Sequence, residues 1–241
     1  MPLSLKIRAG IDTPDKKRHY NEGLFTRVAT EYDGATRAMS LGRDQVWKRR
    51  LVNMLPDFPA PNCVDLACGT GDVTAALAGR FPNGQVVGID LTPAMVEVAR
   101  SCCDQANVTF QVQDMCRTDV PDGWADVVTG SYALRNAPVL DEALREVRRL
   151  LKPGGWAVFL DFAKPPARWK QSLQLPLLKA WGGFWGVVLH GGPEHAYIAE
   201  SLRQFPDRVA LRERFTWHGF TLRGARNCFG GMLEILAFVR H

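Results

Sequence analysis

The sequence has 241 residues, a formal net charge of +5 and a hydrophobic fraction of 46%. These values suit one α/β domain of ordinary size with a substantial core, and they exclude a disordered chain. Lysine and arginine are spread along the sequence instead of being massed in a tail, so we expect no nucleic-acid partner. We read the excess charge as a source of solubility, with attraction to anionic lipid as the alternative.

The cysteines and the apolar segments predict the compartment. The six cysteines show neither a C-x-x-C pair nor the Cys/His spacing of a metal site, so we expect reduced, mostly buried thiols in a cytoplasmic protein and no metal. Thiol-bound metalloid chemistry is the alternative. The N-terminus lacks the charged-then-apolar pattern of a signal peptide. The longest apolar stretch, residues 173–189, is interrupted by Pro176, Lys179 and a glycine pair and is a poor membrane span.

The N-terminal region predicts helices that precede the first strand. Residues 1–20 are polar and charged, and we expect a loose arm there. A helical apolar pattern follows from residue 20, breaks at residues 33–34 and resumes in a second helix over 44–55. Three prolines between residues 56 and 61 then end the helical region.

Residues 63–72 predict a strand, a tight turn and the start of a helix. The apolar run ends in Asp65, and Gly69 and Gly71 allow a sharp turn or the close approach of a ligand to the backbone. A helix that follows such a turn presents unpaired N–H groups to a small polar ligand. The spacing is G-x-G, without the third glycine of dinucleotide folds or the lysine of a phosphate loop. Alone, it is equally typical of an ordinary glycine turn.

The second strand, residues 85–90, changes that balance because it also ends in a carboxylate, Asp90. In nucleoside-binding α/β sheets, an acidic residue about 20 residues after the first turn accepts hydrogen bonds from ribose hydroxyls. Thr92 and Pro93 then predict the N-cap and first residue of the next helix.

The rest of the chain continues the alternation of strands and helices. The pattern predicts helices at 93–104 and 141–151, strands at 108–113, 126–132 and 156–162, and a helix with an antiparallel hairpin over 207–241. Residues 166–200 are dense in apolar and aromatic side chains. They predict either a helical lid that walls an apolar substrate pocket or lies against a bilayer, or a core helix packed on the sheet.

Several motifs carry a family resemblance. V-D-L-A-C-G-T-G-D at 64–72 and V-V-G-I-D at 86–90 resemble motif I and its partner in class I S-adenosylmethionine-dependent methyltransferases. The similarity extends over nearly the whole chain, and the chain looks most like the ubiquinone/menaquinone biosynthesis C-methyltransferase family. A-L-R-N at 133–136 and D-F-A-K-P at 161–165 carry it further. Thr36, Ala133 and His195 stand where that family usually has Asn, Gly and Tyr.

The resemblance implies a fold and its division along the chain. It implies an α/β domain with a Rossmann-like, seven-stranded class I methyltransferase sheet, helices on both faces, an N-terminal helical cap and a helical lid. Within this single domain of residues 1–241, we expect the cap at 1–55, the cofactor-binding core at 60–165, the lid and substrate region at 166–205, and the C-terminal helix and hairpin at 206–241.

The resemblance also implies S-adenosyl-L-methionine as cofactor. The residues that it places at this cofactor are Tyr32, Asp65, Ala67, Gly69, Thr70, Gly71, Asp90, Leu91, Asp114, Met115 and Ser131. Trp47 is a further candidate, although a packing role is the alternative for Trp47 and Tyr32. By position, Asp114 fits a contact with the adenine amine and Met115 a contact with the adenine ring. The alternative is that Asp114 is an exposed carboxylate in a turn and Met115 a core residue.

For catalysis, the resemblance points to Arg135 and Asn136. A phenolic acceptor carbon becomes nucleophilic when the neighbouring hydroxyl loses its proton, and a phenol pKa near 10 makes that loss rare at neutral pH without help. Arginine stays protonated, so Arg135 either stabilises the phenolate or orients a water that takes the proton, with Asn136 holding the arrangement. Asp114 is a candidate to share a water in the same network. His195 is a second candidate for the base, with a surface or structural role as the alternative.

The function that we expect is C-methylation of a prenylated quinol or phenolic ring, as in ubiquinone or menaquinone biosynthesis. Two alternatives stay open: methylation of another small acceptor, such as an aromatic natural product, an amine or a phospholipid headgroup, and a non-methylating, cofactor-bound protein such as a pericyclase. The expected partner is a hydrophobic aromatic small molecule. A homodimer and contact with the inner face of the membrane are further expectations.

Overall fold

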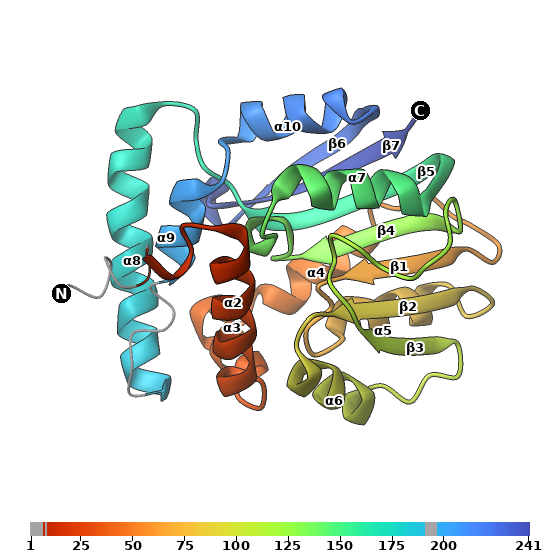
Figure 1. Cartoon of the computed structure of the whole chain (residues 1–241), viewed down its shortest axis with the longest axis horizontal. Coiled ribbons are helices and arrows are strands. Elements are labelled where there is room, and N and C mark those ends of the chain that lie inside the picture. Colours follow the sequence, from red (N-terminus) through yellow and green to blue (C-terminus); the bar gives the residue numbers. More distant parts are fainter. Residues whose placement is uncertain (1–6, 8, 191–196) are drawn as a thin grey trace.

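The computed structural model describes residue 7 and residues 9–190 and 197–241. Within this part of the chain, seven strands form one sheet in the order β3-β2-β1-β4-β5-β7-β6, which confirms the predicted Rossmann-like α/β class (Figure 1). The strands are β1 Asn62–Leu66, β2 Gln85–Asp90, β3 Val108–Val112, β4 Ala125–Ser131, β5 Leu151–Phe162, β6 Phe220–Cys228 and β7 Leu233–Arg240. The helices are α2 Pro14–Val28, α3 Tyr32–Met39, α4 Asp44–Val52, α5 Asp72–Arg80, α6 Pro93–Cys102, α7 Leu140–Leu150, α8 Arg168–His190, α9 Tyr197–Gln204 and α10 Arg208–Trp217, with short 3₁₀ turns η1 Leu134–Asn136 and η3 Phe229–Gly231.

Strand β1 sits at the point where the strand order reverses. It pairs in parallel with β2 on one side and β4 on the other, and the chain passes from β3 back across β2 and β1 to reach β4. In open α/β sheets, ligands bind in the crevice that such a reversal leaves outside the carboxyl ends of the strands. Strand β7 runs antiparallel between β5 and β6, so the predicted terminal hairpin is confirmed.

Alternating side chains of the central strands feed two separate cores. On β5, Ala157 and Phe159 pack with α7 and α10, whereas Val158 and Leu160 pack with α4 and α5 on the opposite face. A strand covered on both faces reads as a continuous apolar run, which is how residues 156–160 read in the sequence. The helices therefore lie on both faces, as predicted.

The N-terminal helices differ from the prediction in two places. Helix α2 begins at Pro14, with Thr13 as its N-cap, so the loose arm expected over residues 1–20 is wrong from that point. Ile7 and Ile11 are buried against Leu24 and Tyr197, a contact between distant segments that the polar composition does not reveal. The predicted break at residues 33–34 lies inside α3; the chain breaks at residues 29–31 instead.

Helix α2 is fastened to the carboxyl edge of the sheet by polar side chains. Lys17 Nζ donates to the carbonyls of Arg135 and Ala137 at 2.9 and 2.8 Å, and Asn21 Nδ2 donates to the carbonyl of Asn136 at 2.8 Å. Three successive carbonyls at the end of η1 therefore have partners on α2. Burial, with a smaller effect of the Arg135 charge, lowers the pKa of Lys17 to about 8.

We expect the aromatic stack under α10 to be a major source of stability. Phe215 is fully buried and lies parallel to Phe238 with ring centroids 3.9 Å apart. Phe215→Ala should lower the free energy of unfolding by about 3–5 kcal/mol. Trp217→Ala, at a 77% exposed position on the same helix, should change it by less than about 0.5 kcal/mol. Urea unfolding of the two variants checks this, and equal effects would contradict it.

The hydrogen bonds from Lys17 to the carbonyls of Arg135 and Ala137 give a second stability prediction. Lys17→Met leaves two carbonyls without their donor and should cost about 1–3 kcal/mol of unfolding free energy. Lys16→Met removes an exposed ion pair with Asp12 and should cost less than about 1 kcal/mol. Chemical unfolding of both variants measures the difference.

The same lysine predicts a pH dependence. The folded pKa of about 8 lies below the unfolded value of 10.5, so the unfolded state binds the proton more tightly between these values. Stability relative to Lys17→Met should therefore rise as the pH increases through that window. Unfolding curves of both proteins at several pH values give the difference, and a fall with pH would refute the assigned environment of Lys17.

Candidate active site

The turn after β1 is built from residues in left-handed conformation. Ala67, Gly69 and Gly71 have φ angles of 51°, 55° and 89°. Gly71 caps α5 with a φ angle that favours glycine, and a Cβ at this position would be closely packed, 3.1 Å from the Phe110 ring and 3.2 Å from Ala99. The N–H of Gly69 donates to Asp90 Oδ2 at 2.9 Å, which ties the turn to the end of β2.

Asp65 lies behind this turn and is almost fully buried. Its two carboxylate oxygens accept hydrogen bonds from the hydroxyls of Thr74 on α5 and Thr129 on β4, both at 2.7 Å. Burial raises the pKa of Asp65 to about 6, and the two hydroxyls oppose that rise. Asp65 therefore joins β1, β4 and α5 and supports the turn from below.

A pocket opens at the carboxyl ends of β1 to β4, with a volume of about 650 Å³ including its open side. We call it the sheet-edge pocket. Its lining is Asn21, Phe25, Tyr32, Ala67, Gly69, Asp90, Leu91, Thr92, Met95, Asp114, Met115, Ser131, Tyr132, Asn136 and Pro138. Eight of the residues predicted at the cofactor are in this lining. Asp65, Thr70 and Gly71 are outside it, and Thr70 instead donates to Asp33 at 2.6 Å.

Asp90 offers acceptor oxygens to the sheet-edge pocket. Oδ2 accepts from the N–H of Gly69 and Oδ1 from the N–H of Thr92, each at 2.9 Å, so the carboxylate is held by backbone groups on both sides. Burial raises its pKa, and the two backbone hydrogen bonds oppose this rise. Each oxygen keeps a further lone pair for a hydroxyl of a ligand.

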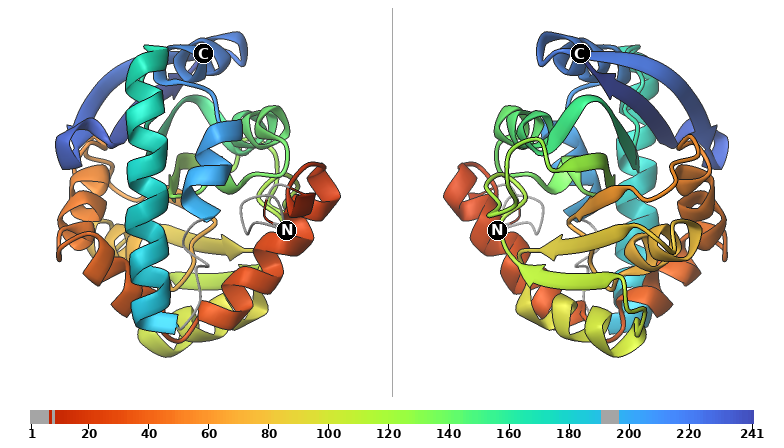
Figure 2. Two further views of the ribbon diagram at one scale, coloured as in Figure 1. Left: turned by 90° about the vertical axis from the view of Figure 1, so that its left-hand side faces the viewer. Right: turned by 90° about the vertical axis from the view of Figure 1, so that its right-hand side faces the viewer.

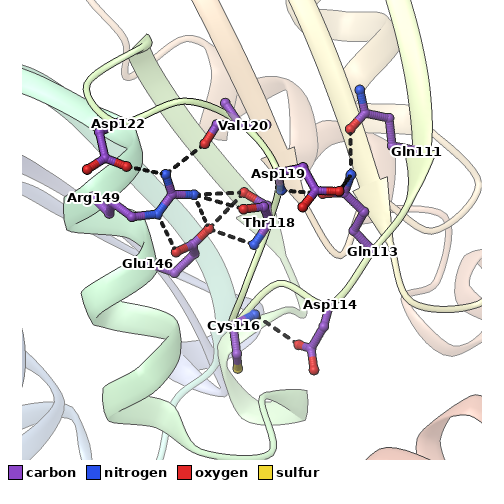
Figure 3. A network of polar contacts seen from close by, with 10 residues as sticks. All are labelled: Gln111, Gln113, Asp114, Cys116, Thr118, Asp119, Val120, Asp122, Glu146 and Arg149. Carbon is purple, nitrogen blue, oxygen red and sulfur yellow. Dashed lines mark hydrogen bonds and ion pairs between the residues drawn. The ribbon is translucent and has the colours of Figure 1, made fainter.

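The loop after β3 brings Asp114 and Met115 to the same pocket, and a polar network braces it (Figure 3). Glu146 on α7 accepts from the N–H and hydroxyl of Thr118, and Arg149 donates to the carbonyls of Thr118 and Val120. Burial raises the pKa of Glu146, but hydrogen bonds from Arg149 and Thr118 outweigh it and lower the pKa overall. The loop is therefore anchored to α7. Asp114 itself receives Arg18 Nε from α2 at 2.7 Å.

A second, mostly apolar cavity of about 920 Å³, including its open side, lies beside the sheet-edge pocket. We call it the apolar cavity. Its lining is Leu24, Phe25, Val28, Tyr32, Thr36, Met39, Ser40, Trp47, Tyr132, Arg135, Asn136, Phe162, Leu178, Trp181, Tyr197, Ile198, Phe229 and Leu233. Phe25, Tyr32, Tyr132 and Asn136 belong to both linings. Molecules bound in the two hollows would therefore lie next to each other, and both would contact these four side chains.

Arg135 places a buried positive charge in the wall of the apolar cavity. Its guanidinium lies 5.4 Å from the ring centre of Phe162 and 5.7 Å from that of Tyr197, and it donates to the hydroxyl of Ser201. Asp161 compensates the charge: its carboxylate lies 3.5 Å from Arg135 Nε and accepts the backbone N–H of Arg135 at 3.0 Å. Burial raises the pKa of Asp161 despite the nearby Arg135 charge.

Asn136 and Tyr132 stand between the two hollows. Asn136 Nδ2 donates to the carbonyl of Tyr132 at 2.8 Å, and Asn136 Oδ1 accepts from the hydroxyl of Tyr197 at 3.1 Å. Tyr132 has a φ angle of 57°, unusual for a bulky residue, and its hydroxyl donates to Asp44 at 2.7 Å. Asp44 in turn pairs with Lys48 at 2.6 Å. Both side chains are thus held in place by other groups.

The structure separates some predicted residues and adds others. Trp47 does not line the sheet-edge pocket; it lines the apolar cavity, where it packs on Phe229. His195 lies outside the described residues. Sequence reasoning missed Tyr132, which the strand-end position beside Ser131 could have suggested. It also missed Asn21 and Phe25, which lie on α2.

Comparison with known proteins identifies the family. A family model described as "ubiE/COQ5 methyltransferase family" matches residues 13–237. A demethylmenaquinone methyltransferase of Thermus thermophilus is 33% identical over 86% of this chain and 96% of that protein. One of Symbiobacterium thermophilum is 32% identical over 86% of this chain and 87% of that protein. A ubiquinone/menaquinone biosynthesis C-methyltransferase of Shewanella sp. strain ANA-3 is 31% identical over 92% of this chain and 90% of that protein.

Solved structures share the fold at much lower identity. A methyltransferase of Haloferax volcanii, in complex with the Trm112 activator, matches with a TM-score of 0.66 and 18% identity over 90% of this chain and 98% of that one. A SAM-dependent methyltransferase of Aquifex aeolicus matches with a TM-score of 0.62 and 13% identity over 87% and 98%. Together with the family match over nearly the whole sequence, these findings show that the chain belongs to the ubiE/COQ5 methyltransferase family and is an S-adenosylmethionine-dependent methyltransferase.

Proposed function

We propose that this methyltransferase transfers its methyl group to a ring carbon of a prenylated quinol or phenol, as in ubiquinone or menaquinone biosynthesis. The relatives at 31–33% identity carry names from these two pathways. One observation supports the acceptor class most strongly. The apolar cavity shares four wall residues with the sheet-edge pocket, so an oily, aromatic acceptor in it would lie next to the cofactor.

The sheet-edge pocket fits S-adenosylmethionine in its chemistry. Asp90 offers oxygens for the ribose hydroxyls, Asp114 offers one for the adenine amine, and Leu91 and Met115 offer apolar surface for the ring. The left-handed turn at Gly69 keeps the backbone free of a side chain beside this position. The cofactor supplies an electrophilic sulfonium methyl group when bound. The chain aligns the two partners and excludes water.

Arg135 is the group that we assign to activation of the acceptor. A phenol of pKa near 10 is mostly protonated at neutral pH, and a fixed positive charge in a low-dielectric wall stabilises the phenolate. Arg135 is 4% exposed and surrounded by the rings of Phe162 and Tyr197, so water screens its charge little. Asn136, held by Tyr132 and Tyr197, would orient the acceptor or a water beside it.

The base that removes the hydroxyl proton is assigned to a water positioned by this network. Arginine keeps its proton, and burial raises the pKa values of Tyr132 and Tyr197, so neither tyrosine is an effective base. His195 stays a second candidate from the sequence. Three further expectations also stay predictions. They are the division of the single domain at residues 55, 60, 165 and 205, the cytoplasmic location at the inner face of a membrane, and the homodimer.

The assignment of Arg135 is tested by methyl transfer from labelled donor to a demethylated prenylated quinol. Arg135→Ala should lower kcat by about 10²–10³-fold while the Kd of the cofactor in calorimetry stays unchanged, because Arg135 lies outside the sheet-edge pocket. Arg145→Ala, an exposed change on α7, is the matched control and should keep full activity.

Loss of Arg135 also leaves Asp161 as an unpaired buried carboxylate, which could unfold the protein. The double variant Arg135→Ala/Asp161→Asn removes both charges together and should fold while remaining inactive. Full activity in either folded variant would refute the role of Arg135. If the unaltered protein binds the cofactor but methylates no prenylated quinol, the proposed acceptor class is wrong.

A further inference from the structure

Helix α8 presents a continuous apolar stripe to solvent. Six large side chains on it are between 56% and 66% exposed: Trp169, Leu173, Leu177, Phe184, Val187 and Val188. At about 100° per residue, all six fall within an arc of about 100° around the helix. We call this set the outer stripe. Single exposed apolar residues are ordinary, but a row along one helix marks an interaction surface.

A different side of α8 faces the apolar cavity. Leu178 and Trp181 line the apolar cavity, and Trp181 Nε1 donates to the carbonyl of Met39 at 3.2 Å. The helix lies across the outside of the molecule, beyond the carboxyl ends of the central strands (Figure 2). One helix thus separates the apolar cavity from whatever covers the outer stripe.

The charged side chains on α8 are all positive. Residues 162–193 contain no aspartate or glutamate, and α8 carries Arg168, Lys170 and Lys179, all exposed. On the helical wheel, Lys170 borders one edge of the stripe, and the other two lie about 80–100° beyond the opposite edge. An apolar face flanked by cations is typical of helices that lie in the interface of an anionic bilayer.

We propose that the outer stripe of α8 lies on an anionic phospholipid surface, with its apolar side chains below the headgroups and the three cations among the phosphates. A second copy of the chain is a poorer occupant, because pairing α8 with α8 would bring six positive charges together without a single acid on either helix. No helix in the described part of the chain is both long and apolar enough to cross a membrane, and the proposal needs none.

The proposal rests on the proposed function only for its purpose: a prenylated acceptor is dissolved in the bilayer, and the helix at the surface also walls the apolar cavity. Binding itself requires neither cofactor nor acceptor. Vesicle binding and acceptor methylation can therefore fail separately, and the two ideas are tested by different measurements.

The test is co-sedimentation of the full chain with vesicles, without cofactor or acceptor. Vesicles of phosphatidylcholine alone are compared with an equimolar mixture of phosphatidylcholine and phosphatidylglycerol. We expect at least about tenfold tighter binding to the mixed vesicles, weakened by salt. Leu173→Ser/Leu177→Ser/Phe184→Ser should lower the binding at least tenfold, and Lys170→Glu/Lys179→Glu should remove the preference for the anionic lipid.

Trp217→Ser, which removes an exposed aromatic side chain on α10, is the matched control and should bind like the unaltered protein. Circular dichroism verifies folding, and light scattering gives the molecular mass of each variant. The triple variant should keep its turnover on a water-soluble, short-chain acceptor, because none of its three positions lines the apolar cavity. The proposal would be overturned if the protein bound both kinds of vesicle equally well, or if the triple variant bound the mixed vesicles as tightly as the unaltered protein. It would also be overturned if the unaltered protein bound no vesicles and formed a dimer that the triple substitution dissociates.

Discussion

The buried carboxylate of Asp65 is the constraint on which the rest of the site depends. It stands at the reversal of strand order, where β1 pairs with β2 on one side and β4 on the other, and its two oxygens accept from one hydroxyl on β4 and one on α5. Burying a carboxylate is costly, and the pKa raised to about 6 expresses that cost. In return, the two hydrogen bonds hold β1, β4 and α5 in one fixed arrangement. The turn that carries Gly69 and Gly71 is set by these three elements.

From this fixed turn, the two hollows follow by geometry. The loops after β1 to β4 end at the same edge of a parallel sheet, so the side chains of Asp90 and Asp114 reach one pocket. The chain leaves β4 through Tyr132 in a left-handed conformation and enters η1 at once, which turns Arg135 and Asn136 into the wall of the neighbouring cavity. The strain at Tyr132 is held by its bond to Asp44. One short turn after β4 thus contributes residues to the walls of both hollows.

The sheet and the cofactor side were predictable because they depend on local patterns. Apolar runs that end in Asp65 and Asp90 mark strand ends, and Gly69 and Gly71 mark the left-handed turn between β1 and α5. The acceptor side was not predictable in the same way. Phe25, Tyr197 and Trp181 are ordinary apolar residues of amphipathic helices, and nothing in their sequence separates a cavity wall from a core position. The burial of Ile7 and the hydrogen bonds from Lys17 are long-range contacts, which composition does not encode.

The two hollows are lined by different sets of elements. Most residues of the sheet-edge pocket lie at the carboxyl ends of the strands or in the loops that follow them, and α7 braces one of these loops through Glu146 and Arg149. The apolar cavity is lined largely by helices α2, α3, α8 and α9, and Phe25 of α2 and Tyr32 of α3 line both hollows. Arg135 differs from these helical residues, because its buried charge is compensated by Asp161 on β5, and so this part of the cavity wall is tied to the sheet.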